Sequence, residues 1–361
     1  MNKISLRLLV IAFWSALLLL ILYGPKLHQK EFEENSIIVF TWGDIFEPSV
    51  VEAFEKETGI RVHLNYYSAN EELLVKLKAT KAEGYDLIVP SDYAVRMLRR
   101  EELLQPLDKS KIDFLKDLNP ILLNHPFDPS NEFSVPFSWE IFGFGIDKDY
   151  FAGREVPESW KLIFDKNFID YRIGMVNDPI DATEFASMYL YGPKFLKANL
   201  QQQKEITELL SEQHKWVEVY ANFRTDYLLA TKNCPVVVTS SSYIWRTMRL
   251  VPFVRFVIPQ EGTFIIIENL CIPKASKKQD LVYRFMNYVY RTESSSKHFS
   301  TYGFFPATIH TEQWKDLDPL ADKLIHATPE EFGRYRFLRE DVLPESVLRN
   351  LWVVVKTQND E

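Results

Sequence analysis

Three carboxylates lie in segments where a folded chain must give an acidic side chain a partner. Asp178 and Asp181 are three residues apart, between an expected strand and an expected helix, and Glu268 lies inside the apolar run TFIIIENLCI. A buried carboxylate needs a cation or good hydrogen bonds, so a ligand cation or an arginine such as Arg246 would serve Glu268. Either aspartate is also a candidate N-cap of the following helix, and the two roles can coexist.

The same carboxylates have a second interpretation, as the acid and base of an enzyme. Against it, the chain has no G-x-S-x-G motif and no phosphate-binding loop, and Gly143 and Gly145 lack the third glycine of a dinucleotide motif. The seven His residues show no H-x-x-x-H spacing, and two cysteines are too few for a cysteine zinc site. We therefore predict no catalytic residue, no metal and no cofactor. Cys234 and Cys271 would either pair in an exported protein or remain two buried thiols.

The charge balance favours a cationic partner. The 361 residues include 42 Lys and Arg against 50 Asp and Glu, a net charge of -8. Four of the basic residues and no acidic one lie in the first 30 positions, so the remaining 38 basic and 50 acidic residues carry a net charge of -12. No run of basic residues suggests a nucleic-acid partner.

The N-terminus contains an apolar run of 16 residues, from Leu8 to Tyr23, that follows Lys3 and Arg7. This pattern is typical of a signal peptide, and it is short for a membrane span, which needs about 20 residues. No A-x-A triplet follows the run. Residues 1–30 are therefore predicted to be a signal peptide or an uncleaved signal anchor, with the rest of the chain outside the inner membrane.

Strands and helices alternate after this segment. We expect strands at 37–42, 60–66 and 85–89, and helices at 49–58, ending at Gly59, and at 70–81, capped by Asn70. The order β-α-β-α-β calls for a mainly parallel sheet, which binds ligands at the carboxyl ends of its strands. Two of these ends are Trp42-Gly43-Asp44 and Ser91-Asp92-Tyr93.

Two later apolar stretches, at 134–146 and 263–272, are expected to cross between two α/β regions. The second region should contain a strand at 173–176, a helix from Asp181, a helix over 200–220 and a strand at 235–238. We predict a first lobe of residues 36–143 plus 270–314 and a second lobe of residues 144–269 plus 315–361. Each lobe would be a mixed sheet flanked by helices, and the crossings would form a hinge.

Six segments of the chain match one known family in order: VFTWGDIF, FEKETGIRVHLNYYSANEELLVKLK, YDLIVPSDYAV, LQPLDKSKI, PFDPSNEFSVPFSW and GFFPAT. Through them the chain resembles the bacterial extracellular solute-binding proteins of polyamine (spermidine/putrescine) ABC transporters. The resemblance implies a two-lobed periplasmic binding protein fold (type II-like) that binds spermidine or putrescine in the interlobe cleft. It also implies delivery to a permease in the inner membrane, a periplasmic location and no enzymatic activity, and we expect a monomer.

The resemblance also implies which residues contact the ligand: Trp42, Asp44, Ser91, Tyr93, Asp178, Asp181, Glu268, Thr239 and Phe304. The chain departs from the family at four of its ligand positions. Thr239, Ile266 and Ile45 fall where the family usually has an aromatic ring, and Phe304 falls where it has a tyrosine.

A polyamine carries separated ammonium groups, which carboxylates can neutralise while aromatic faces hold the methylene chain. Trp42 and Tyr93, with Trp139 or Trp245 nearby, would supply these faces only in part. A binding protein with an altered cationic ligand therefore remains an alternative, as does a ligand-free interaction protein.

Overall fold

A computed structural model describes residues 14, 34–221, 224–311, 318–339 and 341–357. Its strands are β1 (Ser36–Trp42), β2 (Arg61–Tyr67), β3 (Leu87–Ile88), β4 (Ser134–Asp147), β5 (Ile173–Met175), β6 (Val217–Tyr220), β7 (Val236–Ser240), β8 (Val254–Val257), β9 (Thr263–Cys271), β10 (Phe305–Pro306) and β11 (Tyr335–Phe337). Its helices are α2 (Pro48–Thr58), α3 (Asn70–Thr80), α4 (Asp92–Arg100), α5 (Lys161–Phe164), α6 (Pro179–Tyr191), α7 (Leu200–Gln213), α8 (Asp226–Ala230), α9 (Ser241–Met248), α10 (Gln279–Val289), α11 (Thr292–Tyr302), α12 (Pro319–Ile325), α13 (Pro329–Phe332) and α14 (Glu345–Thr357).

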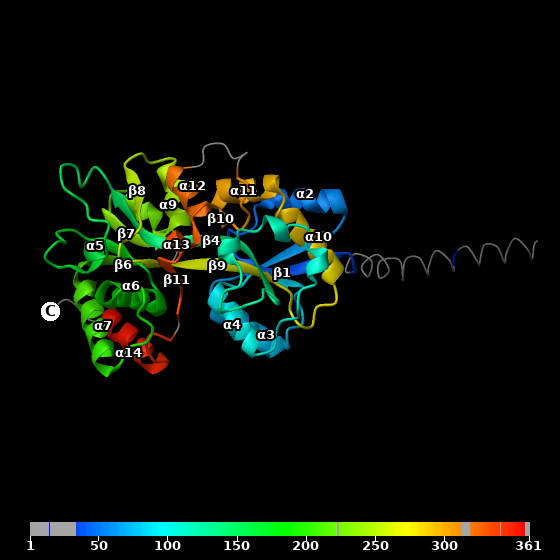
Figure 1. The fold of residues 1–361 in the computed structure, drawn as a ribbon, viewed down its shortest axis with the longest axis horizontal. Coiled ribbons are helices and arrows are strands. Elements are labelled where there is room, and N and C mark those ends of the chain that lie inside the picture. The colour runs from blue at the N-terminus through cyan, green and yellow to red at the C-terminus, as the bar shows by residue number, and fades with distance from the viewer. Residues whose placement is uncertain (1–13, 15–33, 222–223, 312–317, 340, 358–361) are drawn as a thin grey trace, which may run out of the picture.

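Two strands run between the two halves of the molecule (Figure 1). The strand order is β2-β1-β3-β9-β4-β7-β5-β6, so β9 and β4 lie in the middle. The first part of β4 pairs antiparallel with β9, and its last part, from Phe142 to Asp147, pairs with β7 and β8. The pairs β1–β2, β1–β3, β5–β6 and β5–β7 are parallel. The predicted two-lobed α/β fold is thus confirmed, with its crossings on β4 and β9.

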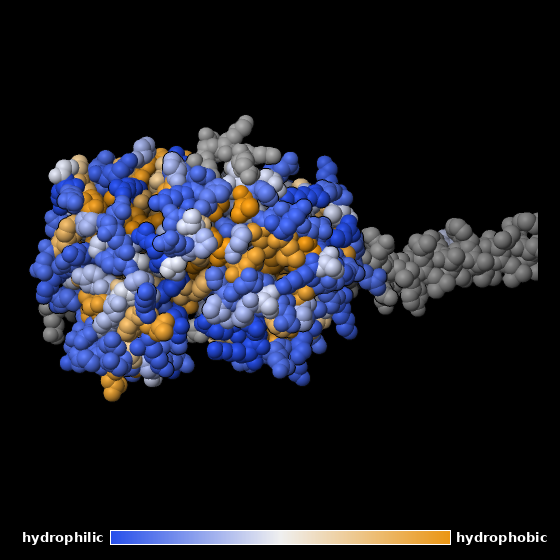
Figure 2. Space-filling view, viewed as in Figure 1, coloured by the Kyte–Doolittle hydropathy of each residue, from blue (hydrophilic) through white to orange (hydrophobic). Residues whose placement is uncertain are grey.

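The molecule has two apolar cores, the first of which extends into the second half through Val237, Ile244 and Phe256. One core surrounds β1 and β3 and includes Phe54, Phe285 and Trp139. The other contains Phe144, Trp160 and a stacked pair formed by Phe185 and Phe264, whose ring centroids lie 4.9 Å apart. Figure 2 shows polar side chains over most of both halves, and apolar ones near the middle, where the halves meet.

The C-terminal segment packs on both cores. Leu324 and Phe332, from α12 and α13, belong to the first core, whereas Leu338, Leu348 and Val355 belong to the second. The predicted segment 315–361 of the second lobe is therefore divided in its packing, and the lobe boundaries stay a prediction.

Several predicted elements need correction at their ends. The strand at 85–89 is only the two residues of β3, and the helix over 200–220 ends at Gln213, because 214–216 form a 3-10 turn and 217–220 form β6. Gly59 does end α2, with a φ of 72° that suits glycine. Asn70 does not cap α3, since the N-cap position is Ala69.

Cys234 and Cys271 are both buried and unpaired. The predicted export segment, residues 1–30, lies outside the described residues apart from position 14. In the part of the chain that the structure describes, none of the helices combines the length and the apolar character that crossing a membrane requires.

A buried ion pair joins β11 to α6. The Glu184 carboxylate is fully buried and contacts Arg336 Nη2, and its Oε1 accepts a hydrogen bond of 2.8 Å from the Arg339 backbone N–H. Burial raises the pKa of Glu184 to about 7, although Arg336 acts to lower it. Arg336 therefore offsets part of the cost of burying this carboxyl group at the point where the C-terminal segment returns to the second core.

The substitution Arg336→Ala should lower the free energy of unfolding by roughly 3–5 kcal/mol, because it leaves a buried carboxylate without its counter-ion. The loss should be smaller at pH 5 than at pH 8, since a protonated Glu184 needs no cation. Urea unfolding at the two pH values measures both effects. The control is Arg349→Ala, which removes an exposed pair with Glu345 and should cost about 0.5 kcal/mol or less. Equal losses in the two variants would contradict the prediction.

Candidate ligand-binding site

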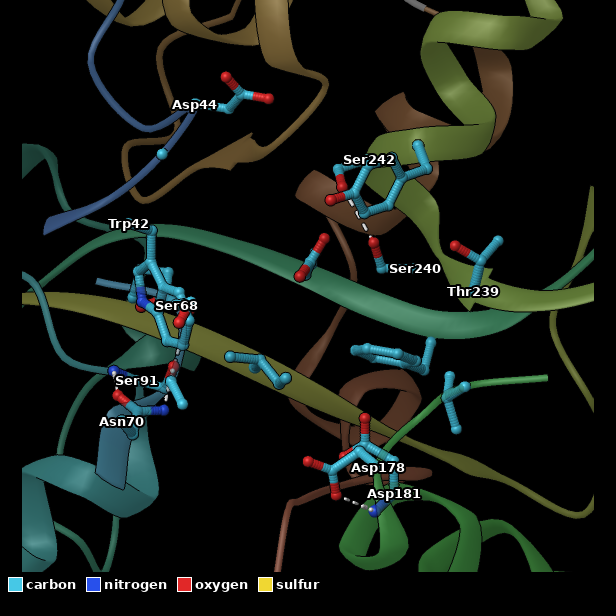
Figure 3. A pocket seen from close by; sticks show the side chains of 18 of the residues that line it. Trp42, Asp44, Ser68, Asn70, Ser91, Asp178, Asp181, Thr239, Ser240 and Ser242 are labelled. Atoms are coloured by element: carbon cyan, nitrogen blue, oxygen red, sulfur yellow. Dashed lines mark hydrogen bonds between the residues drawn. The ribbon is translucent and has the colours of Figure 1, made fainter. Parts of the chain in front are cut away.

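A cavity of about 630 Å³ lies between the two halves and is lined by residues of both. All nine residues predicted to contact the ligand line this one cavity: Trp42, Asp44, Ser91, Tyr93, Asp178, Asp181, Thr239, Glu268 and Phe304. Figure 3 shows Trp42, Asn70 and Ser91 on one side of it and Asp178, Asp181 and Thr239 elsewhere on the wall. Ile45 and Ile266, two of the positions where an aromatic ring is absent, line it as well. The structure thus brings together residues that are up to 262 positions apart in the chain.

Glu268 is held by two side-chain donors of the first half. Trp42, at the end of β1, donates from Nε1 to Glu268 Oε2 at 2.9 Å, and the Ser91 hydroxyl donates to Oε1 at 2.8 Å. Asn70 in turn donates from Nδ2 to the Ser91 hydroxyl at 3.1 Å, so it braces this group instead of capping α3. Burial raises the pKa of Glu268 well above its ordinary value, and these two hydrogen bonds only partly oppose the rise.

Arg246 is not the partner of Glu268, which corrects that expectation. Its Nη1 lies 3.9 Å from Asp44 Oδ2, and its guanidinium carbon lies 4.9 Å from the centre of the Tyr243 ring. Glu268 thus has hydrogen-bond donors but no cation among the residues that contact it, and a ligand cation remains the possible counter-ion.

The start of α6 places the two aspartates. Asp178 is the N-cap, since its Oδ1 accepts hydrogen bonds from the backbone N–H groups of Ile180 at 2.7 Å and Asp181 at 3.2 Å. Asp181 lies in the first turn, so the capping prediction holds for Asp178 alone. Burial raises the pKa of Asp181 well above its ordinary value, and repulsion from Asp178, Glu184, Glu140 and Glu71 raises it further.

Tyr93 lies near acidic residues of both halves, namely Glu71, Asp178 and Asp181. Its hydroxyl donates to Glu71 Oε1 at 3.3 Å, and burial, followed by the nearby Glu71, raises its pKa well above the ordinary value. Tyr93 therefore stays neutral and can present a ring face and a hydroxyl to a ligand.

Neither tryptophan predicted near the site reaches the cavity. Trp139 is fully buried in the first core, where its Nε1 donates to the Pro306 carbonyl at 3.1 Å, and Trp245 packs edge-on against Phe305. The prediction fails because strand alternation turns the side chain of Trp139 away from the cleft. The aromatic side chains that the sequence reasoning missed are Tyr66, Tyr67, Phe142 and Tyr243.

Three further carboxylates were also missed. In the sequence, Glu71 and Glu72 are typical first-turn residues of a helix, and Glu140 lies in the apolar stretch predicted to cross between the lobes. All three line the cavity, which therefore carries seven carboxylates and one guanidinium: Asp44, Glu71, Glu72, Glu140, Asp178, Asp181 and Glu268, with Arg246. The only sequence signal for Glu71 and Glu72 was their position shortly after the predicted strand at 60–66, because a parallel sheet binds ligands at the carboxyl ends of its strands. Across the described ranges, no group of three or more His, Cys, Asp and Glu side chains could hold a metal ion.

Two α/β lobes joined by crossing strands, with a charged cavity between them, define the class of two-lobed solute-binding proteins. Residues 49–320 match the family model described as "Bacterial extracellular solute-binding protein". The match spans most of the chain, which therefore belongs to this family.

Known relatives agree with this assignment. The chain is 28% identical over 303 residues to the "Spermidine/putrescine-binding periplasmic protein" of Escherichia coli, covering 82% of this chain and 85% of the relative. It is 29% identical over 290 residues to the "Putrescine-binding periplasmic protein PotF" of the same organism, covering 76% of this chain and 78% of that protein.

Solved structures share the fold. The spermidine/putrescine ABC transporter substrate-binding protein PotD from Streptococcus pneumoniae matches with a TM-score of 0.75 and 23% identity, covering 89% of this chain and 98% of that chain. The Tp0655 (TpPotD) lipoprotein of Treponema pallidum matches with a TM-score of 0.76 and 21% identity, covering 89% and 99%.

The raised pKa of Asp181 predicts a stability effect in the absence of ligand. An unfolded aspartate loses its proton near pH 3.9, whereas folded Asp181 keeps it to higher pH. The folded state then binds more protons than the unfolded state, so this group lowers the free energy of unfolding as the pH rises through that window. The variant Asp181→Asn escapes this loss and should unfold at a higher temperature than the wild type at pH 8, with a smaller difference at pH 5.

Thermal unfolding of the ligand-free protein at the two pH values tests this. The matched control is Asp170→Asn, an exposed aspartate paired with Arg154, which should show no such growth of the difference with pH. An identical pH dependence in Asp181→Asn and the wild type would rule out the effect.

Proposed function

We propose that this protein captures a polyamine, spermidine or putrescine, in the interlobe cavity and delivers it to an ABC permease in the inner membrane. The observation that carries the proposal is the cavity itself, with its seven carboxylates and single guanidinium. A cavity with this surplus of negative charge is suited to a ligand with several positive charges. Relatives named for binding spermidine and putrescine support the same ligand class.

Two different parts of the fold offer carboxylates to the cavity. Glu268 lies on β9 and is braced by Trp42 and Ser91, whereas Asp178 and Asp181 lie at the start of α6. A ligand with ammonium groups at both ends could contact the two sets at once. Such contacts from both sides are complete only when the lobes close, which supports a hinge motion and recognition of the closed form by the permease.

Aromatic faces would hold the methylene chain. Trp42 and Tyr67 line the cavity as neighbours, with ring centroids 4.5 Å apart, and Tyr93 and Tyr243 line it too. A cation over such a ring gains roughly 0.5–2 kcal/mol.

We further propose that the protein works as a monomer in the periplasm, with residues 1–30 as its export signal or as an anchor, and that it is not an enzyme. The family assignment supports a transport role. Among the described residues, no His, Cys or Lys side chain lines the cavity.

Isothermal titration calorimetry of the purified full-length protein tests the polyamine proposal. Putrescine, spermidine and spermine are titrated separately, and we expect saturable binding of at least one of them. If none of the three binds, the polyamine proposal is wrong, and a ligand-free interaction role becomes the better account. Mass spectrometry of the same mixtures should recover each polyamine unchanged.

The site assignment is tested by Asp178→Asn and Glu268→Gln. Each change keeps the side chain's size and removes its charge, and Asn can still cap α6. Each should weaken polyamine binding by about tenfold or more, since losing one partner of a buried charge pair costs ~2 kcal/mol or more. The control, Asp170→Asn, should leave the affinity unchanged. Normal affinity in both site variants would place the ligand elsewhere.

A second candidate is a binding protein for a different organic cation. Ile45, Thr239, Ile266 and Phe304 all line the cavity at the four positions where the family usually carries another side chain. A site with fewer aromatic rings would hold a bare methylene chain less firmly. Competition of putrescine and spermidine with guanidinium and quaternary ammonium compounds distinguishes this candidate, because only an altered site would prefer those ligands.

A further inference from the structure

Glu140 occupies a position on β4 from which its side chain enters the cavity. Along a strand, successive side chains point to opposite faces. Trp139 and Ile141 are fully buried in the first core, whereas Glu140 and Phe142 between and after them line the cavity. The alternation of β4 therefore directs a carboxylate into the cleft, out of a stretch that is otherwise apolar.

The pairing with β9 shows what lies beside Glu140. Glu140 is directly opposite Ile266, and Ser138 is directly opposite Glu268. Directly opposed residues of antiparallel strands have their side chains on the same face, and diagonal neighbours lie about 7–8 Å apart. Glu140 thus stands next to a position where this chain has isoleucine instead of a ring, and one step along the sheet from Glu268.

One oxygen of the Glu140 carboxylate is left without a partner. Its Oε2 is shielded from solvent and has no hydrogen-bond partner among the described residues. Burial raises the pKa of Glu140 and outweighs the hydroxyls of Ser240 and Ser242 and the charge of Arg246, which act to lower it. Leaving a buried charged oxygen unmatched is destabilising, so a purely structural role would favour a neutral side chain here.

The charge of Glu140 acts on both groups of carboxylates. Its charge raises the pKa of Glu268 on one side and that of Asp181 on the other. The one guanidinium of the cavity, Arg246, lies against Asp44 and Tyr243. A diamine would neutralise Glu268 and the aspartates of α6 and place no ammonium group at Glu140, whose nearby cation, Arg246, also pairs with Asp44.

We propose that Glu140 binds an additional, internal ammonium group of the ligand, so that the site prefers polyamines with three or more ammonium groups to diamines. The inference rests on the proposed polyamine function and adds to it a specificity-determining residue. Discrimination follows because a diamine leaves Glu140 without a ligand cation, so the shorter ligand lacks a contact that a triamine makes.

Calorimetry of the wild type and of Glu140→Gln with spermidine and with putrescine tests the inference. The wild type should bind spermidine more tightly than putrescine. In Glu140→Gln, the spermidine affinity should fall by about tenfold or more, and the putrescine affinity should change by less than about threefold. Glu52→Gln, which removes an exposed charge of α2, is the matched control for net charge and should change neither value.

Thermal unfolding without ligand separates binding from a structural role. Because Glu140 lacks a partner for Oε2, Glu140→Gln should unfold at the same temperature as the wild type or higher, while its stabilisation by spermidine decreases. Lower ligand-free stability, equal losses for the two ligands or an unchanged spermidine affinity would each overturn the role of Glu140 and leave the polyamine proposal standing. Absence of polyamine binding by the wild type would overturn both.

Discussion

Mutual repulsion among buried carboxylates is the constraint to which the rest of the structure must respond. Removing a charge from water costs several kcal/mol unless a partner replaces the lost hydration, and like charges close together raise that cost. The chain offsets part of it with neutral donors. Trp42 and Ser91 donate to Glu268, and the backbone at the start of α6 donates to Asp178. The helix N-terminus adds a favourable field for negative charge. The remaining imbalance favours protons in the empty cavity and, we propose, ligand cations in the occupied one.

The two crossing strands carry this arrangement. β4 and β9 pair over 134–141 and 265–271, so one surface of the central sheet belongs to the cleft and the other to the first core. A one-residue shift in this register would exchange Trp139 with Glu140 and move the charge into the core. The hydrogen bond from the Ile267 backbone N–H to Asp92 Oδ2, at 3.0 Å, helps to hold β9 against the start of α4. The strands that join the lobes thus also position the groups that would bind the ligand.

This chain lacks an aromatic ring at three positions where the family usually has one, and the loss has a physical consequence. Ile266 removes ring surface from the cleft at the point where Glu140 enters it from the facing strand. An exchange of ring surface for charge would shift recognition from the methylene chain towards the ammonium groups. The number of charges on the ligand would then matter more than the length of its apolar spacer.

Local patterns in the sequence determined much of this protein. An apolar run indicated β1, one apolar face followed by Gly59 indicated α2, and alternating apolar residues indicated β2. The apolar runs at 134–146 and 263–272 indicated the strands that cross between lobes. The resemblance to the family indicated nine site residues, and all nine line the cavity. Only the tertiary structure decided which side of β4 faces the cleft. The sequence reasoning chose Trp139 and overlooked Glu140, because both lie in one apolar run and only pairing with β9 sets their directions. Likewise, only the folded chain placed Arg246 against Asp44 and Asn70 against Ser91, since these contacts join residues that are distant in sequence.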